Sequence, residues 1–199
     1  MNALRSALAL CAILAFASTL QRGAQRAEPQ STESSWSPVI QGVRGRLFVV
    51  SEGDLRQPQG RVEIELQNVT NALTPIPIWW GNWNDMLKFG LEEGSGAPVV
   101  SDVSLGGNMQ VPPPFWLELL PRSTTRATVT ATLYQHLPSP ERLLIRPTVF
   151  QGWILFPGRT WTPYLNATFT PPKSKEERQT QFTGPLRLPR VALPEIAFR

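Results

Sequence analysis

Short runs of the chain alternate apolar and polar residues, and the most regular runs assign a buried face. In residues 61–69 the apolar side chains of Val62, Ile64 and Leu66 face one way, while Glu63 and Glu65 face the other. A period of two residues is that of a β-strand with one buried face. We therefore predict a half-buried strand here, with the two glutamates on its solvated side.

The same period occurs elsewhere. Residues 86–93 place Leu87, Phe89 and Leu91 inward, and residues 126–135 place four apolar residues on one face: Ala127, Val129, Ala131 and Leu133. Further candidate strands occupy residues 45–50, 75–80, 99–105, 115–120, 143–156 and 162–170.

Turn residues separate these runs, and no segment has a helical period. The chain contains 20 prolines, and an interior proline removes a helical hydrogen bond and clashes with the preceding turn. Seven to nine short strands with one buried face are typical of an antiparallel β-sandwich or barrel. The pattern thus predicts an all-β fold.

The first 17 residues have the pattern of a signal peptide. Arg5 supplies a positive charge, an apolar run extends from Ala7 to Ala17, and Ala15 and Ala17 are small residues at a cleavage site. The run is shorter than the roughly 20 residues that a membrane-spanning helix needs. We predict cleavage after Ala17, no membrane span in the mature chain, and a disordered polar lead-in over residues 18–35. An uncleaved anchor that reaches Leu20 is the alternative.

The single cysteine, Cys11, lies inside the predicted signal peptide. The mature chain would then have no disulfide, and its core alone would hold it together. An exported protein without cysteines favours a bacterial envelope or secreted protein over a small disulfide-rich module. We expect a secreted or periplasmic location.

The net charge of +4 comes from the end of the chain and not from its body. Residues 36–172 contain ten basic and ten acidic residues, whereas residues 173–199 contain six basic and three acidic residues. No basic patch of the kind that binds nucleic acid is evident, so no nucleic-acid partner is predicted. The tail over residues 173–199 is punctuated by prolines. Its apolar residues favour docking along the sandwich or pairing at an open edge over disorder.

Three segments resemble the immunoglobulin-like domains of secreted bacterial proteins, nearest to the bacterial intracellular proteinase-inhibitor type. They are "IELQNVTN" (residues 64–71), "LKFGLEEGSGAPV" (residues 87–99) and "LLPRSTTRATVTA" (residues 119–131). The resemblance covers residues 39–172 and implies an immunoglobulin-like sandwich. Arg122 stands where the turn of that type usually has glycine, and the cysteines and buried tryptophan of antibody domains are missing. The resemblance also suggests peptidase inhibition as one role, although the architecture hosts many unrelated functions.

Candidate catalytic and metal-binding residues are few. His136 is the only histidine, no nucleophile-elbow motif accompanies it, and we expect it to be an exposed loop residue. One histidine argues against a zinc site. Asp85, Glu92 and Glu93 are the best local candidates for calcium ligands, but they are more simply explained as acidic residues of loops and turns. We predict no enzymatic activity, no metal and no cofactor.

The stretch "IPIWWGNWND" (residues 76–85) holds the most informative cluster of aromatic residues. In an extended chain Trp80 joins Ile78 in the core, and Trp79 takes the opposite face. Gly81 and Asn82 break the strand and leave the next tryptophan in a polar loop. The candidate ligand-binding residues are Trp79, Asn82, Trp83, Asn84 and Asp85. Aromatic rings beside amides and carboxylates suit carbohydrate, whereas packing over the end of the sandwich is the competing interpretation.

The sequence therefore favours an exported, non-enzymatic β-sandwich that serves as a structural or protein-interaction module of the bacterial envelope. It would bind an envelope protein through a sheet edge or a loop end. Carbohydrate binding to a polysaccharide through the exposed tryptophans is the first alternative, and peptidase inhibition is the second.

Overall fold

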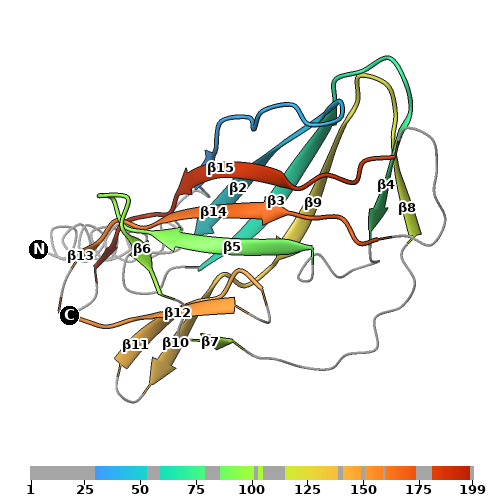
Figure 1. Ribbon diagram of the computed structural model, residues 1–199. Coiled ribbons are helices and arrows are strands. Elements are labelled where there is room, and N and C mark those ends of the chain that lie inside the picture. Colours follow the sequence, from blue (N-terminus) through green and yellow to red (C-terminus); the bar gives the residue numbers. More distant parts are fainter. Residues whose placement is uncertain are drawn as a thin grey trace, which may run out of the picture.

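The computed structural model describes residues 30–52, 59–78, 86–100, 103–104, 115–138, 141–148, 151–158, 160–173 and 181–197. Within these ranges the chain consists of β-strands joined by turns and bends, without a helix (Figure 1). No described segment is a helix that is long and apolar enough to cross a membrane. The all-β class predicted from the alternating pattern is confirmed.

The first sheet contains the most regular of the alternating runs. Its members are β1 (Gln30–Glu33), β2 (Val43–Glu52), β3 (Gln59–Asn68) and β9 (Thr124–Thr130), in the order β1-β2-β3-β9. All neighbours are antiparallel. Val62, Ile64 and Leu66 are 0%, 1% and 1% exposed, so the buried face that alternation assigned to β3 is confirmed.

The second sheet brings the end of the chain beside its middle. Its members are β15 (Leu186–Ala192), β14 (Tyr164–Phe169), β5 (Leu87–Glu92) and β6 (Pro98–Val99), in the order β15-β14-β5-β6. All neighbours are again antiparallel. The predicted inward residues Leu87, Phe89 and Leu91 are buried.

A third four-stranded sheet, made of short strands, and two two-stranded sheets complete the described structure. They are β10 (Tyr134–Pro138), β11 (Glu141–Ile145), β12 (Gln151–Leu155) and β7 (Val103–Ser104); β4 (Thr74–Ile78) with β8 (Phe115–Leu119); and β13 (Thr160–Trp161) with β16 (Ile196–Ala197). The predicted number of seven to nine strands is wrong, because the described residues alone contain sixteen. Several strands have only two residues, and the run predicted over 143–156 divides into β11 and β12.

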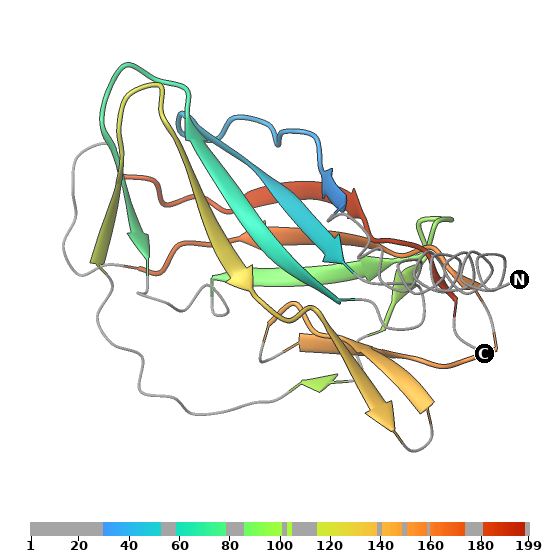
Figure 2. The same ribbon diagram turned by 180° about the vertical axis from the view of Figure 1, so that it is seen from behind.

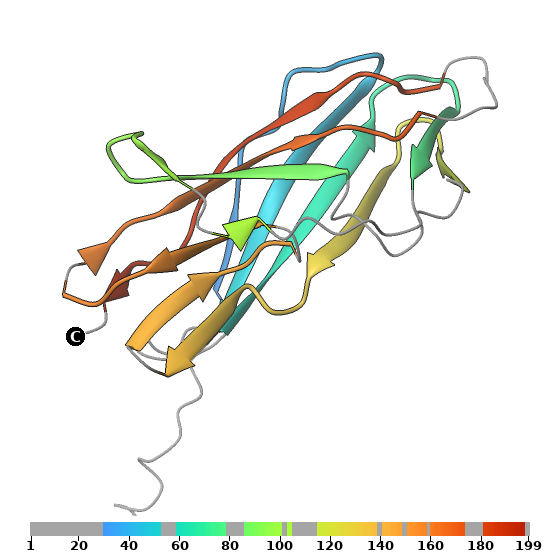
Figure 3. The ribbon, with the colours of Figure 1, turned by 60° about the horizontal axis from the view of Figure 1, so that its bottom comes forward.

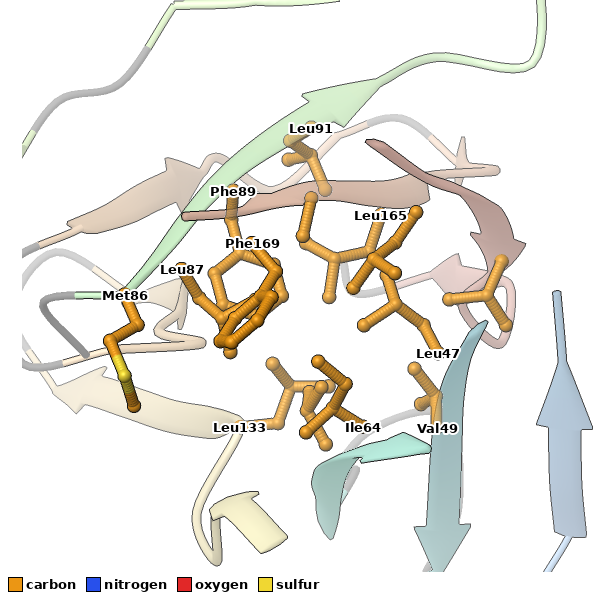
Figure 4. Packing of buried hydrophobic residues seen from close by; sticks show 14 of the residues in the cluster. Leu47, Val49, Ile64, Met86, Leu87, Phe89, Leu91, Leu133, Leu165 and Phe169 are labelled. Carbon is orange, nitrogen blue, oxygen red and sulfur yellow. The ribbon is translucent and has the colours of Figure 1, made fainter. Parts of the chain in front are cut away.

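The core lies between the two larger sheets. Figure 4 shows Leu47 and Ile64 of the first sheet facing Leu165 and Phe169 of the second. β2 and β15 are in close contact at Gly45 of β2. A Cβ atom at this position would lie 2.8 Å from Leu188 Cδ2 and 2.9 Å from Leu186 Cδ2. A larger residue here would therefore force these leucine side chains to move.

The tail beyond residue 172 forms part of the fold. β15 pairs with β14, β16 pairs with β13, and Phe182 is completely buried. The tail therefore docks on the sandwich, as expected, and it does so by pairing with β14 and β13. The strands also continue past the boundary predicted at residue 172, and β15 lies beside β14 (Figures 1 and 2). Leu186, Leu188 and Val191 of β15 are buried in the core.

Residues 30–35, which were predicted to belong to a disordered lead-in, include the strand β1. β1 pairs with β2, and Thr32 Oγ1 donates a hydrogen bond to the carbonyl oxygen of Ala192 at 2.8 Å. Ser34 Oγ accepts a hydrogen bond from Leu47 N at 3.0 Å. Polar composition suggested disorder here, but these short side chains bond the backbones of β2 and β15 and fix the segment.

The turn before β9 explains why arginine at position 122 is unusual. Arg122 has a φ of 56°, in the left-handed region that favours glycine. Its backbone N–H donates to Thr70 O at 3.1 Å, and its Nε donates to Asn71 Oδ1 at 2.9 Å. The turn therefore keeps the geometry of a glycine position although the residue is arginine.

Replacing Arg122 by glycine should stabilise the protein. We expect Arg122→Gly to raise the free energy of unfolding by about 0.5–1 kcal/mol, because relief of the left-handed backbone outweighs the flexibility of glycine and an exposed hydrogen bond. Arg122→Ala is the matched control, since it loses the same hydrogen bond but keeps the Cβ atom, and it should be less stable than the parent. Urea unfolding of the three proteins measures the order. Equal stability of the glycine and alanine variants would contradict backbone strain at this turn.

Candidate functional site

The predicted ligand-binding residues Trp79, Asn82, Trp83, Asn84 and Asp85 lie outside the described residues. The described residues on either side are buried. β4 is buried along its whole length, and Met86 is 1% exposed. Ile78 and Met86 both belong to the hydrophobic core.

His136 lies in β10, opposite Leu143 of β11, and its side chain is exposed. The predicted exposure agrees with the structure, but the residue belongs to a strand and not to a loop. Among the described residues, no three or more histidine, cysteine, aspartate or glutamate side chains form a group that could hold a metal ion.

Exposed apolar side chains lie at the end of the sandwich where β3 ends and β9 begins. The register of β4 and β8 begins with Thr74 opposite Leu119. Leu73 and Leu120 are the next residues outward along these two strands and therefore lie side by side. They are 39% and 59% exposed.

Asn68, at the end of β3, holds these two loops together. Its side chain is completely buried, and its Nδ2 donates to Ala72 O at 2.7 Å and to Leu119 O at 3.1 Å. Its Oδ1 accepts from Thr70 N at 2.9 Å and from Thr70 Oγ1 at 2.8 Å. One buried amide therefore fixes both loops, and with them the two exposed leucines.

A third segment joins the same end of the molecule. Val39 and Ile40, which are 49% and 38% exposed, precede a two-residue turn at Gln41 and Gly42, where both φ angles are positive. The carbonyl oxygen of Gly42 accepts a hydrogen bond from Val69 N at 2.8 Å, which ties this turn to the loop after β3.

The tail also reaches this end. Gln41 Oε1 accepts hydrogen bonds from Thr183 N at 2.8 Å and from Gly184 N at 3.2 Å. Figures 1 and 3 show the segments before β2, after β3, before β9 and before β15 meeting at one end of the sandwich. We call the exposed apolar residues here the loop-end surface: Val39, Ile40, Leu73 and Leu120.

Exposed apolar residues that gather at one place on a folded protein mark a surface for partners more often than scattered ones do. The sequence pattern did not single out these four residues. One sequence signal for Leu120 was present. In residues 115–120, Leu120 lies on the same face of the strand as Glu118, which is exposed. An apolar residue on that face is expected to be exposed as well.

The outer face of the first sheet forms a second distinctive cluster. Phe48 is 4% exposed because two guanidinium groups cover its ring, Arg46 with Cζ at 4.6 Å from the ring centroid and Arg126 with Cζ at 3.6 Å. Arg44 and Arg46 cover the ring of Trp36 in the same way, at 4.6 and 4.4 Å. Arginines of β2 and β9 thus cover two aromatic rings, that of Phe48 in β2 and that of Trp36 in the segment before β2.

Two glutamates form ion pairs with three arginines of this sheet. Glu63 pairs with Arg126 and, at 2.8 Å, with Arg61, while Glu65 pairs with Arg46 at 2.5 Å. The prediction that Glu63 and Glu65 are solvated is wrong: Glu63 is 9% exposed, and the side chain of Glu65 is 14% exposed. The arginine stems and aromatic rings cover this face, and alternation alone does not reveal such a cover. These ion pairs and the contacts between guanidinium groups and aromatic rings stabilise the outer face of the first sheet.

Burial raises the pKa of the Glu63 carboxyl, but the hydrogen bonds and charges of Arg61 and Arg126 lower it more, so the pKa lies below its ordinary value of 4.5. A lowered pKa in the folded state stabilises the protein above the pKa of the unfolded state. That contribution is lost as the pH falls through the folded-state pKa.

We therefore expect the stability of the protein to decrease on acidification below about pH 4.5. Glu63→Gln should weaken this dependence, since the amide cannot titrate, and should be less stable than the parent at neutral pH. The exposed Glu195 is the control position for the loss of a surface carboxylate, and Glu195→Gln should be about as stable as the parent at neutral pH. Thermal unfolding from pH 3 to pH 7 measures the profiles. The same acid dependence in Glu63→Gln and in the parent would contradict the role of this carboxylate.

Comparison with known proteins gives no match: no family model, no curated protein sequence and no solved structure is similar to the chain. The candidate surfaces are therefore interpreted from their own geometry.

Proposed function

We propose that the protein is an exported, non-enzymatic β-sandwich that acts as a protein-interaction module of the bacterial envelope and binds its partner through the loop-end surface. One observation carries this proposal. Leu73 and Leu120 lie side by side at the end of the β4–β8 pair, at 39% and 59% exposure, and a buried asparagine holds both of their loops. A rigid, exposed apolar pair at a loop end suits a protein partner better than a small polar ligand.

The order of the strands supports an immunoglobulin-like sandwich as the finer description of the fold. The antiparallel order β2-β3-β9 corresponds to strands A, B and E of that architecture, and β5-β14-β15 corresponds to C, F and G. In this correspondence the loop after β3 is the B–C loop, and the segment before β15 belongs to the F–G connection. Variable domains bind their ligands with these loops, and the loop-end surface lies on the same end.

Site-specific photocrosslinking tests the proposed function. A photoreactive amino acid at position 120 should capture a discrete protein from the envelope fraction. The same residue at position 100 should not, although Val100 is 82% exposed and follows β6 at the other end of the second sheet. Leu73→Ser with Leu120→Ser should abolish binding of the captured protein without lowering the melting temperature. Identical adducts from both positions, or none from position 120, would overturn the proposal.

Carbohydrate binding through Trp79, Asn82, Trp83, Asn84 and Asp85 is tested in parallel. Retention of the parent protein on insoluble polysaccharide or peptidoglycan, and loss of retention in folded Trp83→Ala, would favour that function over the proposed one. If the protein slows any enzyme in a panel of peptidases, peptidase inhibition would be favoured instead.

A further inference from the structure

The second surface of interest is the free edge of β9, which is separate from the loop-end surface. Among the described strands β9 pairs only with β3, and it ends the first sheet. Asn68 N donates to Ser123 O at 3.0 Å, so Ser123 directs its backbone groups toward β3. In an antiparallel strand this direction alternates. Thr124, Arg126 and Thr128 therefore direct their N–H and C=O groups away from β3, toward the edge.

The core is also less well covered along this edge. The inward residues of β3 are at most 1% exposed, whereas the inward Ala127 and Val129 of β9 are only partly buried. A further strand beside β9 would cover these two side chains. The edge thus offers both backbone hydrogen bonds and incompletely buried apolar surface.

Sheet edges are commonly protected from pairing by proline, lysine or irregular backbone. The other seven-residue edge strand, β15, contains Pro189. β9, with the sequence TTRATVT, contains neither proline nor lysine. Its register shift is confined to the last residues, opposite Val62 and Glu63, and Arg126 is already neutralised by Glu63. The stretch from Thr124 to Thr128 is regular and open.

The strand is complementary to a second copy of itself in one register. A twofold axis at Arg126 would set two guanidinium groups opposite each other, which destabilises a pair. An axis at Thr125 would extend the pairing into the turn at Arg122. An axis at Ala127 places the smallest side chain on the axis and sets Arg126 opposite Thr128 of the second copy. It also sets Thr125 opposite Val129, a pair of β-branched residues that packs well.

We infer that β9 is a self-association edge, at which two copies of the chain pair antiparallel about Ala127 and join their four-stranded sheets into one continuous sheet. Because Ala127 directs its backbone groups toward its own β3, it forms a non-hydrogen-bonded pair across the axis, and Arg126 and Thr128 exchange the hydrogen bonds. Each Arg126 keeps its own Glu63. An interface built on one strand is small, so the dimer forms reversibly and its population rises with concentration.

Disulfide trapping tests the register directly. Cys11 is the only cysteine of the chain, and Cys11→Ser leaves no competing thiol. In this background Ala127→Cys should form an intermolecular disulfide on mild oxidation, because Cα atoms of a non-hydrogen-bonded antiparallel pair lie about 4.5 Å apart, within disulfide range. Thr125→Cys is the matched control on the same face, where the opposite residue is Val129. We expect at least about tenfold more trapped dimer from position 127.

Sedimentation equilibrium tests the edge without a covalent bond. Thr128→Pro removes an outward N–H group but no bond to β3, so it should raise the dimer dissociation constant at least about tenfold. Thr128→Val keeps the N–H group and should leave the constant within about twofold. Equal trapping at positions 125 and 127, a monomer at all concentrations, or a dimer that persists in folded Thr128→Pro would each overturn the inference. If Thr128→Pro does not fold, the cysteine pair alone decides.

Discussion

Phe182→Ala should lower the free energy of unfolding by about 3–5 kcal/mol, the range observed when a buried phenylalanine is truncated. Phe182 is completely buried and stacks on Phe169, with ring centroids 6.3 Å apart and planes at 11°. Its backbone N–H donates to Pro75 O at 2.9 Å. Phe182 lies ten residues beyond the expected end of the sandwich at residue 172. A large loss of stability in Phe182→Ala would therefore show that the tail stabilises the core.

Phe156→Ala is the matched control for this prediction. Phe156 is 55% exposed, and its contact with Trp161 runs through its backbone carbonyl, which accepts the Nε1 hydrogen bond at 3.3 Å. Its truncation should change stability by no more than about 0.5 kcal/mol. Urea unfolding followed by tryptophan fluorescence measures both variants. A Phe182→Ala protein as stable as Phe156→Ala would mean that the tail does not contribute to the core.

Asn68→Ala should lower the free energy of unfolding by about 2–4 kcal/mol, because it removes a buried amide that makes four hydrogen bonds and leaves the buried Leu119 carbonyl without this donor. It should also loosen both loops of the loop-end surface. Hydrogen exchange at the amide of Thr70 should therefore become faster, beyond the change expected from lower global stability.

Two variants distinguish the contribution of the buried Asn68 amide from a general effect of replacing an asparagine. Asn71→Ala removes an exposed side chain whose Oδ1 accepts from Arg122 Nε at 2.9 Å, and it should cost no more than about 0.5 kcal/mol. Asn68→Asp keeps the acceptor for Thr70 but loses the two donated bonds, so its stability should fall below that of the parent. Equal effects of Asn68→Ala and Asn71→Ala would refute the role of Asn68 as the link between the loops.

The local pattern of β3 and β5 was sufficient to predict their buried faces. Val62 and Ile64 in β3, and Phe89 in β5, lie inward as alternation requires, because one buried face imposes a period of two on any half-buried strand. The prediction for residues 126–135 held only in part. Leu133 is buried but Ala131 is exposed, because the chain bends between β9 and β10 and the alternation does not continue through the bend.

Contacts between distant segments decided the remaining features. Glu63 is buried because arginines from the neighbouring strands and the ring of Phe48 close over the sheet, and the sequence of β3 carries no sign of this cover. The loop-end surface depends on Leu73 and Leu120, which are 47 positions apart and meet only through the register of β4 and β8. The periodicity of one segment does not show which residues of a distant segment become its neighbours.

Local sequence was therefore sufficient to predict the all-β class and the buried faces of β3 and β5, because each depends on backbone geometry and burial within a few residues. Tertiary structure alone shows that the tail supplies β15, that Asn68 joins two loops, and that β9 is the last described strand of the first sheet. Each of these depends on which strands become neighbours, and strand pairing is set by burial summed over the whole core.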